Sequence, residues 1–317
     1  MDMNAAVVDA YGPPEVVRID RRPRPRATGS DVVVEVAAAS VNSGDARIRG
    51  ARFPAGFGVP ARLALGLRGP RRAVLGVALS GRVIEVGPKT TALRIGDRVS
   101  GMTDMRMGAH AEYTAVPEQR LARIPDEVSD EDAAAVLFGG TTALWFLRDR
   151  ARVRPGERVL VIGGAGAVGN HAVQIARSRG AEVTATAGSG NQALLARLGA
   201  HHTVDRTAVR LSDLPGPYDV VFDTVGALHP GTAAPLLSPN GRVILAAATL
   251  AETITKRARV ITGTAGAGRE LVGDLIDGII DGTLTPVIEA TLPLDRIAEA
   301  HARVDSGHKV GSILVRP

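Results

Sequence analysis

Residues 159–169 read VLVIGGAGAVG, and this stretch decides the fold of the chain. A short apolar run ends there at a cluster of four glycines, and apolar residues follow at helical spacing. Glycines let the backbone turn tightly and approach a pyrophosphate, and a helix N-terminus offers free N–H groups and a partial positive charge. An ordinary strand-to-helix turn, with glycines for packing alone, is the alternative. We predict a dinucleotide-binding turn formed by Gly163, Gly164, Ala165, Gly166, Ala167 and Val168.

The composition of the chain is that of a globular protein with a substantial core. Its 317 residues are enough for about two domains, and 45% of them are apolar. Cysteine is absent, which excludes disulfides and cysteine-ligated zinc. No apolar run approaches the ~18 residues of a membrane span. Residues 1–10 lack the basic start and long apolar stretch of a secretory signal. We therefore expect no membrane partner and a cytoplasmic location.

One basic stretch, Arg18–Arg26 (RIDRRPRPR), raises the question of a nucleic-acid partner. Such a stretch can bind an anionic polymer, but it is more often a solvated edge of the protein. Its prolines favour an extended segment that leads into a strand, and the rest of the +5 net charge is scattered along the chain. Nucleic acid is therefore an unlikely partner.

The first third of the chain is rich in short strand patterns that are separated by Gly/Pro turns. This spacing is more typical of a barrel than of a layered sheet. A polar loop into a short helix is predicted at residues 40–50, and a mobile flap rich in Gly, Pro and Leu at residues 52–70. The predicted strands are residues 5–8, 16–19, 31–38, two runs within 74–86 around Ser80-Gly81, a strand after the turn in 93–99, and 111–116.

The pattern changes at Ser129, which is a helix N-cap followed by three acids in the first turn. We expect that helix to end at Gly139-Gly140 and a second helix to cover residues 141–149. Strands and helices then alternate, which predicts a parallel sheet with right-handed crossovers. The later strands are 159–162, 182–187, 202–204, 220–223, 241–247, 260–261 and 311–315, and the later helices are 191–198, 232–237, 270–281 and 294–304.

Further motifs stand in a definite order along the chain: Val41-Asn42 with Asp45, Ser80–Val83 with Glu85–Gly87, Gly96–Val99, Gly108–Tyr113, Gly139–Ala143, the glycine turn, Asp219–Gly226, Gly241–Val243 and His308–Gly311. Together they resemble the medium-chain dehydrogenase/reductase superfamily, in particular its zinc-independent quinone oxidoreductase-like branch. The resemblance covers almost the whole chain. It implies an α/β fold with a GroES-like β-barrel catalytic domain at residues 1–122 and 264–317. A doubly wound Rossmann cofactor-binding domain is implied at residues 123–263.

Zinc members of this superfamily use cysteine ligands and a Gly-His-Glu signature. The corresponding stretch here is Gly76-Val77-Ala78, and the chain has no cysteine. Both zinc sites and zinc-alkoxide alcohol oxidation are therefore excluded, and we expect no metal. A nicotinamide cofactor without a metal still delivers hydride to an acceptor that is electrophilic unaided or polarised by hydrogen bonds. Quinones and α,β-unsaturated carbonyl compounds are such acceptors.

The resemblance places Asn42, Asp45 and Arg47 in the loop beside the nicotinamide. It implies that Asn42 holds the ribose or a substrate oxygen and that Asp45 orients the loop. The alternative is that both residues cap the short helix that follows. Many relatives have a tyrosine, which donates a proton or binds the carbonyl, where this chain has Arg47. An arginine stays protonated, so Arg47 is a poor general acid but a good clamp for an anion or a carbonyl. Solvent or another residue is left to supply the proton.

The residues that follow the glycine turn favour NADPH over NADH. NAD sites usually place an acid about 20 residues past the first glycine, and none occurs in residues 183–204. Ser189 and Asn191 offer hydrogen-bond donors there, and Arg206 stands where relatives often have a phosphate-facing tyrosine. The resemblance and the ends of predicted strands add further cofactor contacts at Thr141, Thr224, Val225, Ala246, Ala247, Ala248, Lys309 and Val310.

The leading interpretation is an NADPH-dependent reductase that transfers hydride to a quinone or an α,β-unsaturated carbonyl compound. One alternative is a tailoring reductase that acts on a polycyclic or polyketide substrate. Another is a cofactor- or RNA-binding protein without turnover, which Arg18–Arg26 and the missing tyrosine favour. Relatives often dimerise by joining Rossmann sheets edge to edge, so the resemblance implies a homodimer through residues 242–262.

Overall fold

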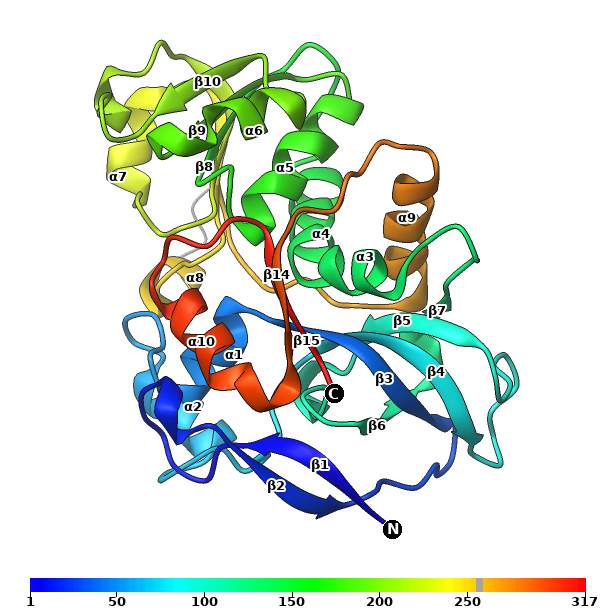
Figure 1. The fold of residues 1–317 in the computed structure, drawn as a ribbon. Coiled ribbons are helices and arrows are strands. Elements are labelled where there is room, and N and C mark those ends of the chain that lie inside the picture. Colours follow the sequence, from blue (N-terminus) through cyan, green and yellow to red (C-terminus); the bar gives the residue numbers. More distant parts are fainter. Residues whose placement is uncertain (255–258) are drawn as a thin grey trace.

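The computed structural model describes residues 1–254 and 259–317, which form two lobes (Figure 1). The chain begins in the lower lobe of that view, crosses to the upper lobe and returns through β14 (Ile288–Pro293) and β15 (Ser312–Arg316). The upper lobe holds a parallel sheet, and the lower lobe holds a mostly antiparallel one. The predicted α/β fold class is confirmed. No helix of the described residues has the length and apolar character that crossing a membrane requires.

The upper lobe is one sheet with helices on both faces. Its strands lie in the order β10-β9-β8-β11-β12-β13, and every neighbouring pair is parallel. Numbered along the chain, this is the 3-2-1-4-5-6 order of a doubly wound dinucleotide-binding sheet. The order reverses between β8 and β11, and ligands bind beyond the carboxyl ends of strands at such a point. The strands are β8 (Arg158–Ile162), β9 (Glu182–Ala187), β10 (His202–Asp205), β11 (Tyr218–Asp223), β12 (Leu237–Leu245) and β13 (Val260–Ile261).

The lower lobe is built on a seven-stranded sheet with the order β14-β15-β3-β4-β5-β7, in which β6 also pairs with β3. Alternate residues Val32, Val34 and Val36 of β3 lie in its core with Leu79 and Val99, because successive side chains of a strand point to opposite faces. A separate two-stranded sheet is formed by β1 (Asp2–Val7) and β2 (Arg18–Pro23). The other strands are β3 (Asp31–Val41), β4 (Ala78–Val86), β5 (Arg98–Met102), β6 (Tyr113–Pro117) and β7 (Leu121–Arg123).

The helices divide between the lobes and the crossings that join them. The lower lobe carries α1 (Ser43–Arg49), α2 (Gly58–Leu65) and α10 (Ile297–Asp305). The crossings are α3 (Asp130–Ala135), α4 (Leu137–Leu144) with a π-helical turn (Trp145–Arg150), and α9 (Arg269–Ile280). The upper lobe carries α5 (Ala167–Ser178), α6 (Gln192–Arg197), α7 (Pro230–Ala233) and α8 (Leu250–Ile254).

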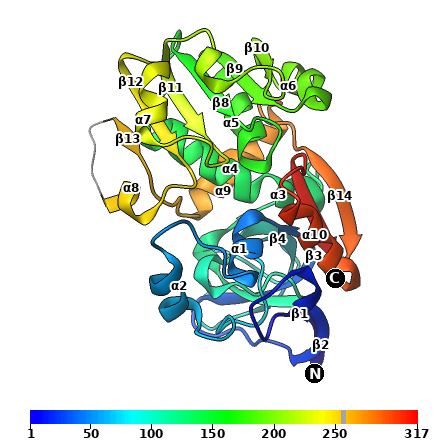
Figure 2. The same ribbon diagram turned by 90° about the vertical axis from the view of Figure 1, so that its left-hand side faces the viewer.

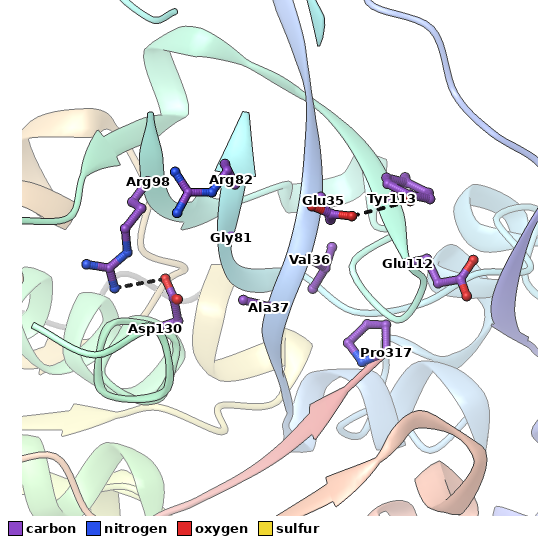
Figure 3. Close-up of a pocket in the computed structure, with 10 residues that line it drawn as sticks. All are labelled: Glu35, Val36, Ala37, Gly81, Arg82, Arg98, Glu112, Tyr113, Asp130 and Pro317. Atoms are coloured by element: carbon purple, nitrogen blue, oxygen red, sulfur yellow. Dashed lines mark hydrogen bonds and ion pairs between the residues drawn. The ribbon is translucent and has the colours of Figure 1, made fainter. Parts of the chain in front are cut away.

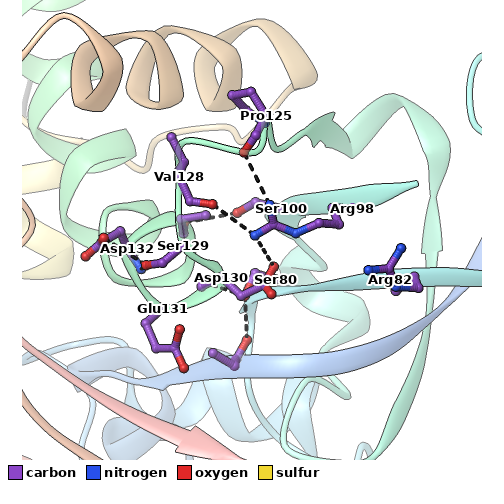
Figure 4. Close-up of polar contacts among 12 residues, drawn as sticks. Ser80, Arg82, Arg98, Ser100, Pro125, Val128, Ser129, Asp130, Glu131 and Asp132 are labelled. Atoms are coloured by element: carbon purple, nitrogen blue, oxygen red, sulfur yellow. Dashed lines mark hydrogen bonds and ion pairs between the residues drawn. The ribbon is translucent and has the colours of Figure 1, made fainter. Parts of the chain in front are cut away.

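Polar contacts fix α3 to the lower sheet (Figure 4). Ser129 caps the helix as predicted, because its hydroxyl oxygen accepts the backbone N–H three residues later at 3.0 Å. Ser80 of β4 and Ser100 of β5 donate to backbone carbonyls of α3, at 2.6 and 3.0 Å. Arg98 pairs with the Asp130 carboxylate at 3.2 Å. The crossing into the upper lobe therefore starts from a fixed point on the lower sheet.

The prediction that a helix ends at Gly139-Gly140 is wrong. The break lies at Val136, where α3 gives way to α4, and α4 then runs through both glycines. A Cβ on Gly139 would lie 1.9 Å from the carbonyl oxygen of Ala167, the first residue of α5. The glycine therefore allows α4 to pack tightly against the start of α5. Glycine occurs both at helix ends and where two backbones approach closely. Gly139 is an example of the second case.

Two predicted strands differ from the observed ones for local reasons. The strand predicted at 16–19 begins later, as β2, because Pro14–Val16 forms a 3₁₀ turn. The two runs predicted within 74–86 are one strand, β4, that passes through Gly81. A Cβ on Gly81 would lie 2.0 Å from the carbonyl oxygen of Glu35. That glycine allows β3 and β4 to approach each other, as glycines inside strands often do.

The flap predicted at residues 52–70 contains a helix, α2, and contacts the upper lobe. The N–H of Leu250 donates to the carbonyl oxygen of Ala55 at 2.9 Å. Figure 2 shows α2 and α8 on the same side of the molecule. The edge strands β7 and β14 carry no sequence prediction. β7 has only three residues, and β14 has no continuous apolar run and no buried residue.

The stretch predicted as a subunit contact, residues 242–262, covers the C-terminal end of β12 and all of α8 and β13. Its residues 255–258 lie outside the described part of the chain. The strand β13 is an edge of the upper sheet. The homodimer stays a prediction.

Candidate active site

The glycine turn connects β8 to α5 at the switch point of the upper sheet. Gly163 has φ +81°, a conformation that L-residues rarely adopt. A Cβ on Gly169 would lie 2.1 Å from the Gly163 carbonyl oxygen, so the turn and α5 can meet only with glycine there. A Cβ on Gly166 would have only that oxygen within 4 Å, at 3.5 Å, so Gly166 faces open space. This is the cradle that a pyrophosphate needs.

A cleft of about 420 Å³, the dinucleotide cleft, opens beside this turn at the carboxyl ends of β8, β9 and β11. Its cationic lining residues are Arg206, Arg210 and Lys309, and no carboxylate lines it within the part of the chain that the structure describes. Arg206 follows β10 directly, and its N–H donates to the Ala187 carbonyl oxygen at 2.9 Å. The open turn and the positive charge fit a phosphorylated dinucleotide.

The C-terminal segment closes one side of the dinucleotide cleft. The N–H of Gly311 donates to the Ala165 carbonyl oxygen at 2.8 Å, and Gly166 and Gly311 form a parallel bridge. Lys309 therefore lines the cleft. Val310 does not line the cleft, and its N–H donates to the Glu289 carboxylate.

His171 of α5 and Lys309 of the cleft lining both have lowered pKa values. Burial lowers the pKa of His171 to about 4, and its Nδ1 lies 2.7 Å from the Ala167 carbonyl oxygen. Burial also lowers the pKa of Lys309 to about 8, which the nearby Glu289 carboxylate partly offsets. The Lys309 ammonium donates to the Gly311 carbonyl and further lowers the pKa of His171 by repulsion. At neutral pH, His171 is uncharged and Lys309 carries the positive charge of this segment.

A second cavity, the acceptor cavity of about 200 Å³, lies between α1, α4 and the carboxyl ends of β11 and β12. Its walls are mostly apolar, and Arg47 is the charged residue among those that line it. Thr224 lines this cavity and the next residue, Val225, lines the dinucleotide cleft, so the two spaces adjoin at the end of β11. The lining residues are Ser43, Arg47, Met102, Phe138, Thr141, Thr142, Phe146, Val168, Thr224, Ala246, Ala247, Gly263, Thr264 and Ala265.

The loop before α1 is held by a capping box. The Asn42 side-chain oxygen accepts the N–H groups of Gly44 and Asp45, and the Asp45 carboxylate accepts the N–H of Asn42 at 3.0 Å. Asp45 is buried 3.9 Å from His110, and its burial raises the pKa of its carboxyl. The capping interpretation is thus the geometry observed for both residues. Asn42 also keeps a buried Nδ2 donor without a partner among the described residues.

Two threonines that line the acceptor cavity, Thr141 and Thr224, have hydroxyl donors that are already used within the protein. Thr141 donates its hydroxyl to the Leu137 carbonyl at 2.7 Å, and Thr224 donates to the Ile162 carbonyl at 2.7 Å. Their oxygens keep free lone pairs and therefore present acceptors to a ligand.

Most of the predicted cofactor residues come together at the two cavities. The dinucleotide cleft is lined by Gly163, Ala165, Gly166, Asn191, Arg206, Val225 and Lys309. The acceptor cavity is lined by Arg47, Thr141, Val168, Thr224, Ala246 and Ala247. The predicted residues that line neither space are Asn42, Asp45, Gly164, Ala167, Ser189, Ala248 and Val310.

Sequence reasoning missed several lining residues. Arg210 lines the dinucleotide cleft, and no motif in the sequence marks it. Met102, Phe138 and Phe146 form apolar walls of the acceptor cavity. Apolar residues of this kind carry no motif, because any core position could hold them.

A hollow of about 420 Å³ also lies on the lower sheet (Figure 3). Its charged residues are engaged locally: Tyr113 donates to Glu35 at 3.4 Å, and Arg98 pairs with Asp130 at 3.2 Å. Arg82 donates to a backbone carbonyl at 2.6 Å. The dinucleotide cleft and the acceptor cavity adjoin each other. Their lining includes Arg206 and Arg47, which have no ion-pair partner among the described residues, so they form the better candidate site.

Comparison with known proteins shows the family to which the chain belongs. Residues 28–126 match the family described as "Alcohol dehydrogenase GroES-like domain", and residues 198–315 match "Zinc-binding dehydrogenase". Within residues 1–254 and 259–317, however, no group of three or more His, Asp or Glu is placed to hold a metal ion.

Several individual relatives align with this chain over its whole length. The chloroplastic NADPH-dependent alkenal/one oxidoreductase of Arabidopsis thaliana is 30% identical, over 100% of this chain and 80% of the relative. The 2-methylene-furan-3-one reductase of Solanum lycopersicum is 29% identical, over 100% of this chain and 79% of the relative. The solved structure of the quinone oxidoreductase from Coxiella burnetii superposes with a TM-score of 0.91 at 28% identity, covering 100% of both chains. The chain therefore belongs to the medium-chain dehydrogenase/reductase superfamily, as an oxidoreductase of the quinone oxidoreductase-like kind.

Proposed function

We propose that the protein is an NADPH-dependent reductase of quinones or α,β-unsaturated carbonyl compounds. The observation that carries this proposal is the junction of the two cavities at Thr224 and Val225. A small molecule in the acceptor cavity would adjoin a dinucleotide in the cleft, as direct transfer between them requires. The names of the Arabidopsis and Solanum relatives, an alkenal/one oxidoreductase and a 2-methylene-furan-3-one reductase, support the acceptor class.

The charge of the dinucleotide cleft favours NADPH over NADH. Arg206 and Arg210 line the cleft with Asn191, and guanidinium groups bind phosphate bidentately. Arg210 also pairs with Asp213 at 2.9 Å, whereas Arg206 has no ion-pair partner among the described residues. We therefore assign the 2′-phosphate chiefly to Arg206. The Arabidopsis relative is named NADPH-dependent, which supports the same choice.

In this mechanism the chain positions its ligands and shapes their surroundings. When bound, the reduced nicotinamide supplies a hydride, with its electron pair, and a solvent proton completes the reduction of the acceptor. The glycine turn and Lys309 hold the phosphates, and the apolar walls of the acceptor cavity limit water. Arg47 provides positive charge toward the acceptor, and Asn42 fixes the loop before α1 through its capping box. Asp45 is a positioning residue that acts through the capping box with Asn42.

A titration with each cofactor tests the assignment of NADPH. We expect the wild-type protein to bind NADPH at least about tenfold more tightly than NADH, the scale of one charge-assisted contact. Arg206→Gln should lose most of this preference. Arg26→Gln, which removes an exposed charge elsewhere, should keep it. A tenfold preference for NADH, or a preference that survives Arg206→Gln, contradicts the assignment.

A screen of acceptors tests the reaction. NADPH oxidation is followed by its absorbance with 1,4-benzoquinone, menadione, 2-hexenal and 3-buten-2-one. We expect turnover with at least one quinone or enone. Absence of turnover above the uncatalysed rate with all four compounds argues against reductase function.

We extend the proposal to the assembly and its location. Residues 1–122 and 264–317 form the catalytic domain, residues 123–263 form the cofactor domain, and two copies associate in the cytoplasm. The edge strand β13 supports this dimer, since an unpaired strand edge can pair with a second chain. Light scattering at micromolar concentration should give the mass of a dimer, and a monomer there contradicts it.

A further inference from the structure

The Arg47 side chain stands out in the acceptor cavity because its charge is not matched by the protein. Arg47 is partly buried and lines a cavity whose other walls include Met102, Phe138 and Phe146. Among residues 1–254 and 259–317, no carboxylate lies within 4 Å of its guanidinium, and no side-chain hydrogen bond involves it. Residues 255–258 read TKRA and contain no carboxylate.

The charges nearest to α1 increase this imbalance. Arg49, which is fully buried, and Arg52 both pair with the single carboxylate of Asp305. Arg52 also repels Arg47 and adds to the effect of burial in lowering the pKa of Arg47. The other nearby acid, Asp45, is bound to the loop N–H of its own capping box. The end of α1 therefore carries an excess of positive charge beside the acceptor cavity.

An unmatched guanidinium in an apolar cavity is costly, because burial removes part of its hydration. A ligand that supplies a negative charge offsets this cost, and the offset is larger where apolar walls lower the local dielectric. A neutral carbonyl oxygen offers one weak acceptor, whereas a carboxylate offers two charged oxygens that match the fork of the guanidinium. The imbalance thus favours an anionic group over a carbonyl as the partner of Arg47.

We propose that the acceptor reduced by this protein carries a carboxylate, and that Arg47 binds this carboxylate as a specificity-determining residue. The inference rests on the proposed reductase function and names its substrate class. The carboxylate faces α1, and the electrophilic enone or quinone part lies toward Thr224 and Ala246, where β11 and β12 end beside the dinucleotide cleft. Neutral quinones and enones fill the apolar part of the cavity alone and are the poorer substrates.

A matched pair of substrates tests the proposal through turnover. The pair is (E)-3-benzoylacrylic acid and its methyl ester, which share the reacting enone and differ in the charge. For Arg47→Met we expect kcat/KM with the acid to fall about 10- to 100-fold, and with the ester by less than about threefold. Comparing the acid-to-ester ratio between enzymes cancels the intrinsic reactivity of each compound.

Two further variants complete this test. Arg47→Lys keeps the positive charge but lacks the paired donors of a guanidinium, so it should retain an intermediate preference for the acid. Arg26→Met removes an exposed charge and should leave the ratio unchanged. If Arg47→Met lowers kcat/KM equally for the acid and the ester, Arg47 contacts the reacting carbonyl or only supports the fold. That result overturns the proposal. An unchanged ratio overturns it as well.

A binding measurement separates this inference from the reductase function. Trp145 is the only tryptophan of the chain, and a Cβ on Gly263 of the cavity rim would lie 2.8 Å from its ring. Its fluorescence is titrated with 3-benzoylpropionic acid and with the corresponding amide, which have no double bond to reduce. The titrations are run with and without NADP⁺. The acid should bind at least about tenfold more tightly than the amide in the wild type and in Arg26→Met, but not in Arg47→Met.

The two proposals fail in different ways. Tight, Arg47-dependent binding of the acid without turnover of any acceptor rejects the reductase function and keeps the carboxylate site. Turnover of neutral quinones or enones, with no preference for the acid in binding or in kcat/KM, keeps the reductase function and rejects the carboxylate site.

Discussion

The dinucleotide cleft and the acceptor cavity share the end of β11, yet they are built differently. One wall of the cleft is the backbone of a single turn, with glycines where a Cβ would collide or fill the space. The acceptor cavity is formed by side chains from positions as far apart as Ser43 and Ala265. A backbone cradle binds what all dinucleotides share, whereas a wall of side chains determines which small molecule fits. Substitutions should therefore abolish function in the first region and redirect it in the second.

The largest effect is expected from Gly169→Ala. The added methyl group would lie 2.1 Å from the Gly163 carbonyl oxygen, and neither backbone segment can move without opening the turn. The free energy of unfolding should fall by about 3 kcal/mol, despite a gain of about 1 kcal/mol in helix propensity. Affinity for NADPH should fall more than about 100-fold, since the cradle is lost. Urea unfolding and cofactor titration measure the two effects.

Gly166→Ala is the matched control for that substitution. Its methyl group would meet only an oxygen at 3.5 Å, so stability should stay within about 1 kcal/mol of the wild type. Cofactor binding should still weaken, because the methyl group enters the cleft. Wild-type stability of Gly169→Ala would show that the turn can relax, and it would remove the contrast between the two regions.

The two regions also differ in their titratable groups, and the free energy of unfolding at acidic pH should show this difference. Burial lowers the pKa of His171 of α5 from 6.5 to about 4. The unfolded chain therefore takes up this proton at a higher pH than the folded chain. The stabilising effect of neutral His171 is present above about pH 6.5 and is lost as the pH falls toward 4. The free energy of unfolding should be about 2 kcal/mol lower at pH 5 than at pH 7 from this residue alone.

Denaturant titrations at pH 7 and pH 5 measure this loss. His171→Asn should show a smaller difference between the two pH values, whereas His202→Gln, on the surface, should show the wild-type difference. Burial also lowers the pKa of His301 in the lower lobe, so part of the acid loss should survive in His171→Asn. A wild-type pH dependence in His171→Asn contradicts the prediction.

The parts of the molecule that sequence predicts well are those whose signal is local. The glycine turn lies within one short stretch, and the predicted strand at 182–187 coincides with β9. Ser129 is the N-cap that its sequence context indicates, because a cap and its acids are neighbours in the chain. For the same reason, the sequence alone offers the capping box of Asn42 and Asp45 as an alternative to direct ligand contact.

The acceptor cavity is harder to predict because it exists only after folding. Phe138 and Met102 become its walls through the packing of α4 against β5, and nothing near them in the sequence marks a ligand site. Gly139 resembles a helix end in the sequence, since the partner that requires a glycine, Ala167, is distant in the chain. A family position singles out Arg47 in the sequence, but its lack of a carboxylate partner depends on where Asp305 lies.

The smallest expected effect concerns Lys309, and it contrasts directly with Arg47. Burial lowers the pKa of Lys309 to about 8 in the free protein, whereas an arginine stays charged throughout the working range. Cofactor phosphates favour the charged lysine and raise its pKa, so binding near pH 8 takes up a proton. Affinity for NADPH should therefore fall as the pH rises from 8 to 9, by at most about tenfold per unit. Binding of a carboxylate at Arg47 should not change over that range.

Titrations with NADPH between pH 7 and pH 9 measure this slope. Lys309→Met should bind NADPH about five- to tenfold more weakly at pH 7, the scale of one partly exposed charge contact. It should also show little dependence on pH. Lys89→Met, which removes an exposed ammonium from the lower lobe, should keep the wild-type slope. If wild type and Lys309→Met have the same slope, Lys309 does not face the phosphates, and the C-terminal segment closes the cleft through its backbone alone.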